Sequence, residues 1–227
     1  MKTHRLLSCV VATLLFTGCT KTIQVAVPPK VDLSRYQSIG LVAFSSNGSS
    51  DLERLSTQKF LQAVQSAQPG TRVVELGTEG QVLASVDRGS WNAATFRAIK
   101  KKHEIDAIIL GRLDVEKAKP DVRLSTLWKA VSVRADVNAT LSAKLIETGT
   151  GATTWTDSSQ ITENVAHAQF NNQGQGQFGA RDPEAAYGKM IGGLACAITD
   201  DFRVHYVTRR VSKSDLQTAS AGGEHSP

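Results

Sequence analysis

The stretch from Val131 to Leu145 reads VSVRADVNATLSAKL, with an apolar residue at every second position. Side chains of a β-strand point alternately to opposite faces, so this period of two predicts a strand with one buried and one solvated face. The turn residues Thr148 to Gly151 follow, and Ala152 to Val165 can return as a partner strand. We therefore predict a long antiparallel hairpin.

The residues before the hairpin alternate between strand and helix patterns. Three short apolar runs predict strands: Ser38–Phe44, Arg72–Leu76 and Asp106–Leu113. Helical patterns lie between them, one capped by Asp51 and another over Trp91–Lys102, with a weaker helical stretch around Val82–Val86. Strands that alternate with helices pair in parallel through crossover connections, so we expect a parallel portion of the sheet here.

After the hairpin, residues 182–206 are expected to form a last helix entered through Pro183. Its apolar stripe comprises Tyr187, Met190, Ile191, Leu194, Ile198 and Phe202. Gly188, Gly192 and Gly193 each weaken a helix by roughly 1 kcal/mol relative to alanine. We therefore expect these glycines to mark close packing on the sheet.

Four segments together carry a resemblance to a known family: SIGLVAF, DAIILGRLDV, LSAKLIETGTGATTW and the closing ITDDFRVHY. They resemble the small domain shared by the curli secretion channel subunit CsgG, the penicillin-binding-protein activator LpoB and the amino-terminal domain of TolB. The resemblance covers about Val31 to Arg210 and includes no catalytic signature. It implies an α/β (α+β) fold, a single three-layer-like domain with a mixed sheet, a long antiparallel hairpin and flanking helices.

The chain begins MKTHRLLSCVVATLLFTGC, with a basic start, an apolar run and a small-residue exit, as in a bacterial secretory signal. The apolar run is too short to remain as a membrane span. The closing residues resemble the lipobox of bacterial lipoproteins, although Phe16 stands where that pattern usually has Leu. The resemblance implies cleavage before Cys19 and its acylation, and Thr20 in place of Asp implies export to the outer membrane. The alternative is an ordinary secretory signal that leaves Cys19 as a free thiol.

Cleavage at this position organises the chain into four parts. We expect residues 1–18 to be the lipoprotein signal peptide, 19–30 a lipidated tether, 31–210 the α/β domain and 211–227 a disordered tail. The last part is rich in small polar residues and has no apolar periodicity.

Charge and cysteine content bear on nucleic-acid binding and on disulfide formation. Without residues 1–18 the chain has 24 basic and 21 acidic side chains, an excess too slight to predict nucleic-acid binding. The basic run Lys100–Lys102 is expected to be a solvated helix face. Cys196 would be the one unmodified cysteine, so we expect no intrachain disulfide and interpret it as a buried apolar thiol.

The segment Gly174–Gly179 reads GQGQFG and so matches the spelling G-x-G-x-x-G of a dinucleotide-binding loop. Such a site requires a buried parallel strand directly before the first glycine, whereas QFNN stands here. We therefore expect no dinucleotide or other cofactor, and we interpret the segment as a mobile loop. Phe170 and Phe178, beside and within it, are candidate residues of a partner-binding loop.

Catalytic and metal-binding patterns are not evident. The histidines at 103, 167 and 205 are widely separated, so we predict no metal site. The sequence lacks G-x-S-x-G, and the neighbouring Asp200 and Asp201 would point in different directions on a helix. We predict no enzymatic activity. An envelope enzyme whose site is assembled only by the fold is left as an alternative.

The sequence thus predicts a lipid-anchored, periplasm-facing adaptor or accessory lipoprotein of the outer membrane. Its expected partners are the lipid bilayer, through Cys19, and an unidentified envelope protein, and a homo-oligomer is left open. The other alternative is a CsgG-like, ring-forming outer-membrane secretion subunit. The hairpin favours a sheet covered by helices instead, because its apolar face is rich in alanine and its partner strand TTWTDSSQIT is mostly polar.

Overall fold

The computed structural model describes residues 21–116, 119–124, 130–171, 176–179 and 183–211. The chain divides into two compact units, residues 29–203 and residues 1–28 with 204–227. The larger unit holds, in chain order, η1 (Leu33–Arg35), β2 (Ile39–Val42), β3 (Ser45–Ser46), α2 (Ser50–Ala67), β4 (Val73–Gly77), α3 (Glu79–Ser85), α4 (Ala93–His103), β5 (Ala107–Val115), β6 (Lys119–Leu124), β7 (Ala130–Glu147), β8 (Thr153–Asn171), β9 (Gly176–Gly179), α5 (Pro183–Ile198) and η2 (Asp200–Phe202). The smaller unit holds β1 (Lys21–Val27) and β10 (His205–Val211).

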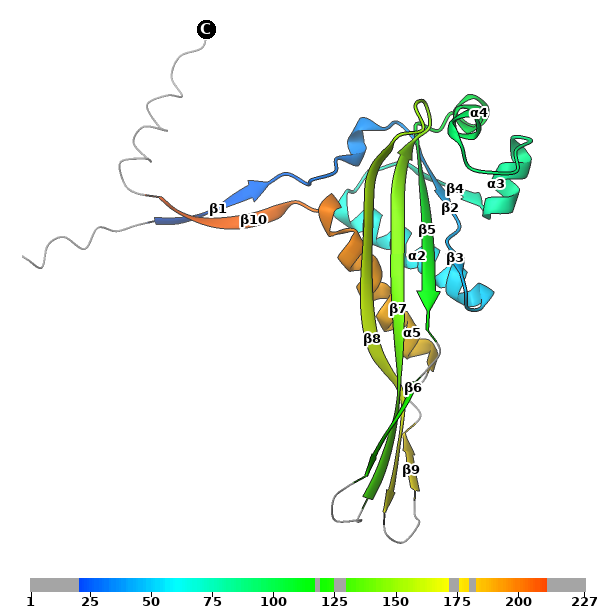
Figure 1. Ribbon diagram of the computed structural model, residues 1–227. Coiled ribbons are helices and arrows are strands. Elements are labelled where there is room, and N and C mark those ends of the chain that lie inside the picture. The colour runs from blue at the N-terminus through cyan, green and yellow to red at the C-terminus, as the bar shows by residue number, and fades with distance from the viewer. Residues whose placement is uncertain (1–20, 117–118, 125–129, 172–175, 180–182, 212–227) are drawn as a thin grey trace, which may run out of the picture. The chain divides into compact units, whose positions relative to one another are not determined.

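The sheet of the larger unit is mixed (Figure 1). Its strand order is β4-β2-β5-β7-β8-β9, with β3 paired to β5 and β6 paired to β7. β2 runs parallel to both β4 and β5. Parallel neighbours need a crossover connection, and helices lie between β2 and β4 and between β4 and β5 in the chain. β5, β7, β8 and β9 are antiparallel neighbours. The predicted α+β class, with a mixed sheet, flanking helices and a long hairpin, is confirmed.

Local sequence explains where the helices begin. Asn92 accepts hydrogen bonds from the backbone N–H groups of Ala94 and Thr95, at 2.9 and 3.0 Å, and so caps α4. Thr78 and Gln81 form a reciprocal capping box at the start of α3. α2 starts after Ser49, and Asp51, which was expected to cap it, lies in its first turn, where a carboxylate favours the helix dipole.

The core occupies both faces of the sheet. One cluster packs β2, β5, β7 and β8 against α2 and α5, and its fully buried residues include Phe44, Leu141 and Leu194. A smaller cluster packs the other face against α3 and α4, around Ile99 and Ile108. The odd positions of β7 from Val137 to Leu145 are buried, while the even positions from Asp136 to Lys144 are partly or fully exposed. The predicted alternation is therefore confirmed over this stretch.

The last helix is shorter than the sequence predicts. It ends at Ile198, and the hydroxyl of Thr199 donates to the carbonyl of Ala195 at 2.7 Å before η2 begins. Acidic residues are unfavourable at a helix C-terminus, and Asp200 and Asp201 follow directly. The residues after them are rich in β-branched and aromatic side chains, which favour a strand.

The expected role of the α5 glycines is wrong at two of the three positions. A Cβ added to Gly188 or Gly192 would meet no atom within 4 Å, so neither marks a close approach to the sheet. At Gly193 the added atom would lie 3.8 Å from the Ile161 side chain of β8, which is ordinary contact. None of the described helices has the length and apolar character needed to cross a membrane.

The smaller unit differs from its expected form. Lys21–Val27 belong to the segment interpreted as a tether, but they form β1 and pair antiparallel with β10 over seven residue pairs. Val211, placed at the start of the tail, is the last residue of β10. The segment KTIQVAV is rich in β-branched residues, which favour a strand once a partner strand is available.

Candidate functional site

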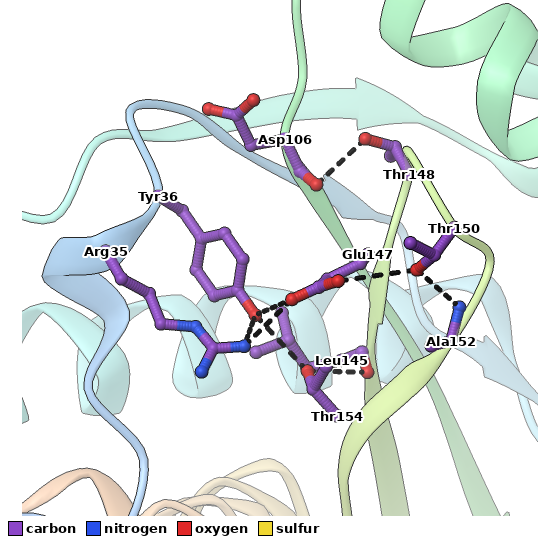
Figure 2. Close-up of polar contacts among 9 residues, drawn as sticks. All are labelled: Arg35, Tyr36, Asp106, Leu145, Glu147, Thr148, Thr150, Ala152 and Thr154. Atoms are coloured by element: carbon purple, nitrogen blue, oxygen red, sulfur yellow. Dashed lines mark hydrogen bonds and ion pairs between the residues drawn. The ribbon is translucent and has the colours of Figure 1, made fainter.

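A polar cluster surrounds the root of the hairpin (Figure 2). Arg35 ends η1 and Tyr36 follows it, Glu147 ends β7 and Thr154 belongs to β8. Nη2 of Arg35 lies 3.0 Å from Oε1 of Glu147 and donates to the Tyr36 hydroxyl at 2.5 Å. The Tyr36 oxygen is also 3.3 Å from Oγ1 of Thr154. The cluster therefore ties the loop after η1 to both strands of the hairpin.

The turn of the hairpin is held against the start of β5. Thr148 is fully buried, and its hydroxyl lies 2.5 Å from the carbonyl oxygen of Ile105 and 2.8 Å from that of Asp106. Gly151 has φ of +77°, and a Cβ there would come within 3.2 Å of Ala93. This backbone conformation favours glycine. The LIETGTG segment of the family resemblance thus has a structural role in this chain, which is to fix the hairpin root.

Electrostatically, the root consists of opposite charges in pairs at a solvated surface. The hydrogen bond to Tyr36, with the charge of Glu147, raises the pKa of Arg35 above its ordinary value. Nζ of Lys100 lies 3.6 Å from Oδ1 of Asp106. The side chains of Arg35 and Glu147 remain 53% and 33% exposed. Ion pairs of this kind stabilise a fold by about 1 kcal/mol or less.

An open pocket of about 440 Å³ lies at this root. Its lining residues are Arg35, Tyr36, Gln37, Lys100, Asp106, Glu147, Gly149 and Thr150. The lining offers hydrogen-bond donors and acceptors, with hydroxyls from Tyr36 and Thr150 and carboxylates from Asp106 and Glu147. No group of three His, Cys, Asp or Glu side chains suited to a metal ion occurs among the residues described. The root is equipped to hold the hairpin and to contact polar groups.

Four strands form the far end of the sheet, which we call the hairpin tip: residues 119–124, 130–136, 164–171 and 176–179. β6 pairs with β7 from Leu124 and Val131 to Lys119 and Asp136, and β9 pairs with β8 from Gly176 and Phe170 to Gly179 and His167. Figure 1 shows this part of the sheet running past the labelled helices.

The register of the hairpin tip aligns residues of similar character across all four strands. The Phe178 row contains Val122, Val133, Ala168 and Phe178, and the Phe170 row contains Leu124, Val131, Phe170 and Gly176. The Gln177 row between them contains Arg123, Ser132, Gln169 and Gln177. Alternate rows of an antiparallel sheet share a face, so the two apolar rows belong to one face and the polar row to the other.

Phe170 and Phe178 therefore belong to paired strands, and their expected position in a mobile loop is wrong. Residues 176–179 of the glycine-rich segment form β9, while residues 174 and 175 lie outside the described residues. β8 continues beyond the expected Val165 to Asn171, and the extra length provides an edge with which β9 pairs. Both neighbours of β8 are antiparallel to it, unlike the parallel strand that precedes a dinucleotide-binding loop.

The sequence analysis also named two cysteines, Cys19 and Cys196, and the acidic residue Asp201. Cys19 lies outside the described residues. Cys196 is exposed, so its interpretation as a buried thiol is wrong, because the buried stripe of α5 lies on the opposite side of the helix. Asp201 is engaged structurally: its carboxylate lies 2.7 Å from Nζ of Lys30 and accepts from the Trp155 indole at 3.4 Å.

The surface of α4 carries the basic run and one histidine contact. Lys100–Lys102 are exposed, which confirms a solvated helix face. Nε2 of His103 lies 3.1 Å from the hydroxyl of Ser85, which itself lies 2.7 Å from the carbonyl oxygen of Val82. A hydroxyl that donates to a carbonyl is not activated by the imidazole, so the pair does not resemble a nucleophile with its base.

The root cluster and the outer strands of the tip were missed by sequence reasoning. Arg35 and Glu147 are separated by 112 residues, and although Glu147 lies in the LIETGTG segment of the resemblance, no sequence pattern links it to Arg35. Alternation in β6 is short and includes Pro120, so it gave little signal. The sequence indicated the turn at Thr148–Gly151 but not its contact with Arg35 and Tyr36.

No family model matches this sequence, and no curated protein matches it in sequence. Similar solved structures include the PelC dodecamer from Paraburkholderia phytofirmans, with TM-score 0.42, 10% identity and coverage of 81% of this chain and 98% of that chain. The LpoB C-terminal domain from Escherichia coli gives TM-score 0.34, 11% identity and coverage of 68% and 94%. Lipoprotein GNA1162 from Neisseria meningitidis gives TM-score 0.32, 19% identity and coverage of 56% and 83%. A likeness at this level does not tell what this chain binds.

Proposed function

We propose that this chain is a lipid-anchored, periplasm-facing protein of the outer membrane that binds another envelope protein and catalyses no reaction. The anchor is supported by the sequence that ends in Cys19, with its basic start, apolar run and small-residue exit. Several acyl chains hold a protein stably at a bilayer, whereas one chain does so only marginally. An anchor also raises the effective concentration of the protein for partners at the same membrane.

The observation that carries the binding function is the register of the hairpin tip. It assigns the Phe178 row and the Phe170 row to one face and the Gln177 row to the other. Apolar residues concentrated on one face favour association, and aromatic residues are enriched at the centres of protein interfaces. A covered phenylalanine buries on the order of 150–250 Å² of surface. We assign Phe170 and Phe178 as the main contacts of this face with the partner.

The hairpin root supports this function mechanically. β7 and β8 run as continuous strands from the root to the tip, and they pair over 17 residue positions with two register shifts. At the root, Thr148 holds the turn against β5 and Glu147 holds it to Arg35. A binding surface built on strands that are fixed in this way loses less conformational entropy when it binds.

Photo-crosslinking in cells tests the proposal. A photoreactive amino acid at Phe178 should capture an envelope protein, whereas the same residue at the neighbouring Gln177, which belongs to the opposite face, should capture much less. The two positions are adjacent in β9, so they differ in face and not in distance from the membrane. Equal capture from both positions, or capture from neither, would contradict a binding surface on the apolar face.

The same experiment separates the adaptor from the ring-forming secretion subunit. Crosslinks from Phe178 to a different protein support the adaptor, and the purified chain should then elute from a sizing column in detergent as a monomer or dimer. Crosslinks between copies of this chain, together with a discrete large species on the column, would replace the adaptor with the ring-forming subunit.

A further inference from the structure

The ribbon formed by β1 and β10 exposes large apolar side chains. Among the side chains that the structure describes, the exposed large hydrophobic ones are Ile23, Val27, Val204, Tyr206 and Val207. All of them belong to the smaller unit. Ile23 and Val27 are each 38% exposed and Val207 is 41% exposed. This concentration of apolar surface needs an explanation, because the described side chains of the larger unit show none like it.

The register shows that one face of the ribbon is mainly apolar. Ile23 pairs with Arg209, Val25 with Val207 and Val27 with His205, so these residues share a face. The other face carries the pairs Thr22 with Arg210, Gln24 with Thr208 and Ala26 with Tyr206. Two strands alone are marginally stable in water, so a ribbon of this kind needs a surface against which its apolar face can pack.

Basic residues gather at one end of the ribbon. Arg209 and Arg210 are exposed and pair with Ile23 and Thr22, at the end of β1 that begins with Lys21. Neither strand contains an aspartate or a glutamate. This basic end is also the end next to Cys19, which precedes Lys21 by two residues. Pairing of β1 with β10 thus brings two arginines to the end of β1 that follows the proposed acylation site in the sequence.

We propose that the apolar face of the β1–β10 ribbon lies on an anionic phospholipid surface. The inference rests on the proposed acylation of Cys19, because two extended residues span only about 7 Å and hold the ribbon at the headgroups. Ile23, Val25 and Val207 then lie against the interface, and Arg209, on the same face, contacts anionic headgroups. Arg210 belongs to the opposite face and adds its charge within a Debye length of the anionic surface. Each arginine near an anionic surface strengthens association by roughly fivefold. The lipid and the ribbon together form a two-part membrane attachment.

Fluorescence quenching in vesicles tests this orientation. The lipidated full chain with Cys196→Ser is incorporated into phosphatidylglycerol vesicles containing brominated lipid, and a fluorophore is attached at Val207→Cys or, as the matched control, at Thr208→Cys. We expect strong quenching at position 207 and weak quenching at its neighbour on the opposite face.

Equal weak quenching in chains that float with the vesicles would overturn the inference and leave the anchor intact. Failure to float would instead refute the anchor. Energy transfer between labels at position 207 on separate chains would assign the face to a second copy and overturn the inference.

A charge test addresses the anionic surface. Arg209→Gln with Arg210→Gln should lower the docking equilibrium constant by roughly 30-fold, seen as lost quenching at position 207 while the chain still floats. Arg97→Gln with Lys101→Gln removes the same charge from exposed positions of the larger unit and should leave quenching unchanged. Quenching that survives the arginine replacements, or that is equally strong in phosphatidylcholine vesicles, would contradict attraction to anionic lipid.

Discussion

Replacing Gly111 with alanine should destabilise the fold, because β5 leaves no room for a side chain at this position. A Cβ there would lie 2.5 Å from ring carbons of Phe44, a separation that real Cβ atoms essentially never show. Phe44 is 1% exposed and its ring centroid is 4.9 Å from that of Phe60, so the ring cannot retreat without disturbing the core. Overpacking of this kind costs about 1–3 kcal/mol of unfolding free energy.

Urea unfolding followed by tryptophan fluorescence measures this loss. With a slope of about 1–3 kcal/mol per molar urea, the midpoint of Gly111→Ala should fall by on the order of 1 M. Gly80→Ala is the control, because no atom lies within 4 Å of the added Cβ and alanine favours the α3 helix by about 1 kcal/mol. Its midpoint should stay or rise.

A double-mutant cycle identifies the cause of the loss. Phe44→Leu makes space beside Gly111, so it should destabilise the Gly111→Ala background less than the wild type, with a coupling free energy of about 1 kcal/mol or more. A midpoint for Gly111→Ala equal to that of the wild type, or additive effects of the two substitutions, would refute the packing argument.

Three further predictions concern single side chains. Thr148→Val should lower the unfolding free energy by about 1–3 kcal/mol, because the buried carbonyl of Ile105 loses its hydroxyl donor. Thr148→Ser should lower it less, and an equal loss in urea unfolding would contradict the role of the hydroxyl. Ser34 donates to Asp32 at 2.6 Å and holds the pKa of that carboxyl below its ordinary value, so Ser34→Ala should raise it in an NMR titration. Because the Asp32 carboxyl has the lower pKa in the folded protein, the stability from this contact is present above the ordinary pKa of the carboxyl and is lost as pH falls through the folded pKa. An unchanged Asp32 pKa in Ser34→Ala would contradict the hydrogen bond as the cause. Cys196 should react with a maleimide in the native protein as fast as an exposed thiol, and protection until unfolding would contradict its position on α5.

Local patterns predicted the centre of the fold because they depend on neighbouring residues. The alternation that begins at Val131 follows from the pleat of β7, in which Ala139, Leu141, Ala143 and Leu145 belong to the core cluster that includes α2 and α5. The turn at Thr148–Gly151 was found because its glycines and threonines are typical turn residues. The strands before and after α2 and α4 were likewise indicated, because the spacing of apolar residues changes between a strand pattern and a helix pattern there.

Long-range pairing was the part that the sequence did not reveal. β1 pairs with β10 across almost the whole chain, and neither strand has a partner nearby in sequence. α5 ends at Ile198. The apolar stripe continues to Phe202, so this pattern alone did not show where the helix gives way to the strand that follows. The root cluster likewise joins Arg35 and Glu147 through the topology of the sheet.

Mass spectrometry of the amino-terminal peptide, taken from protein purified from cell membranes, tests the central claim most directly. The account predicts a chain that begins at Cys19 and carries fatty acyl groups on that residue. A chain that retains Met1, or one whose Cys19 thiol is free and reacts with a maleimide, would contradict the lipid anchor. The proposed membrane contact of the β1–β10 ribbon rests on that anchor and would be contradicted as well.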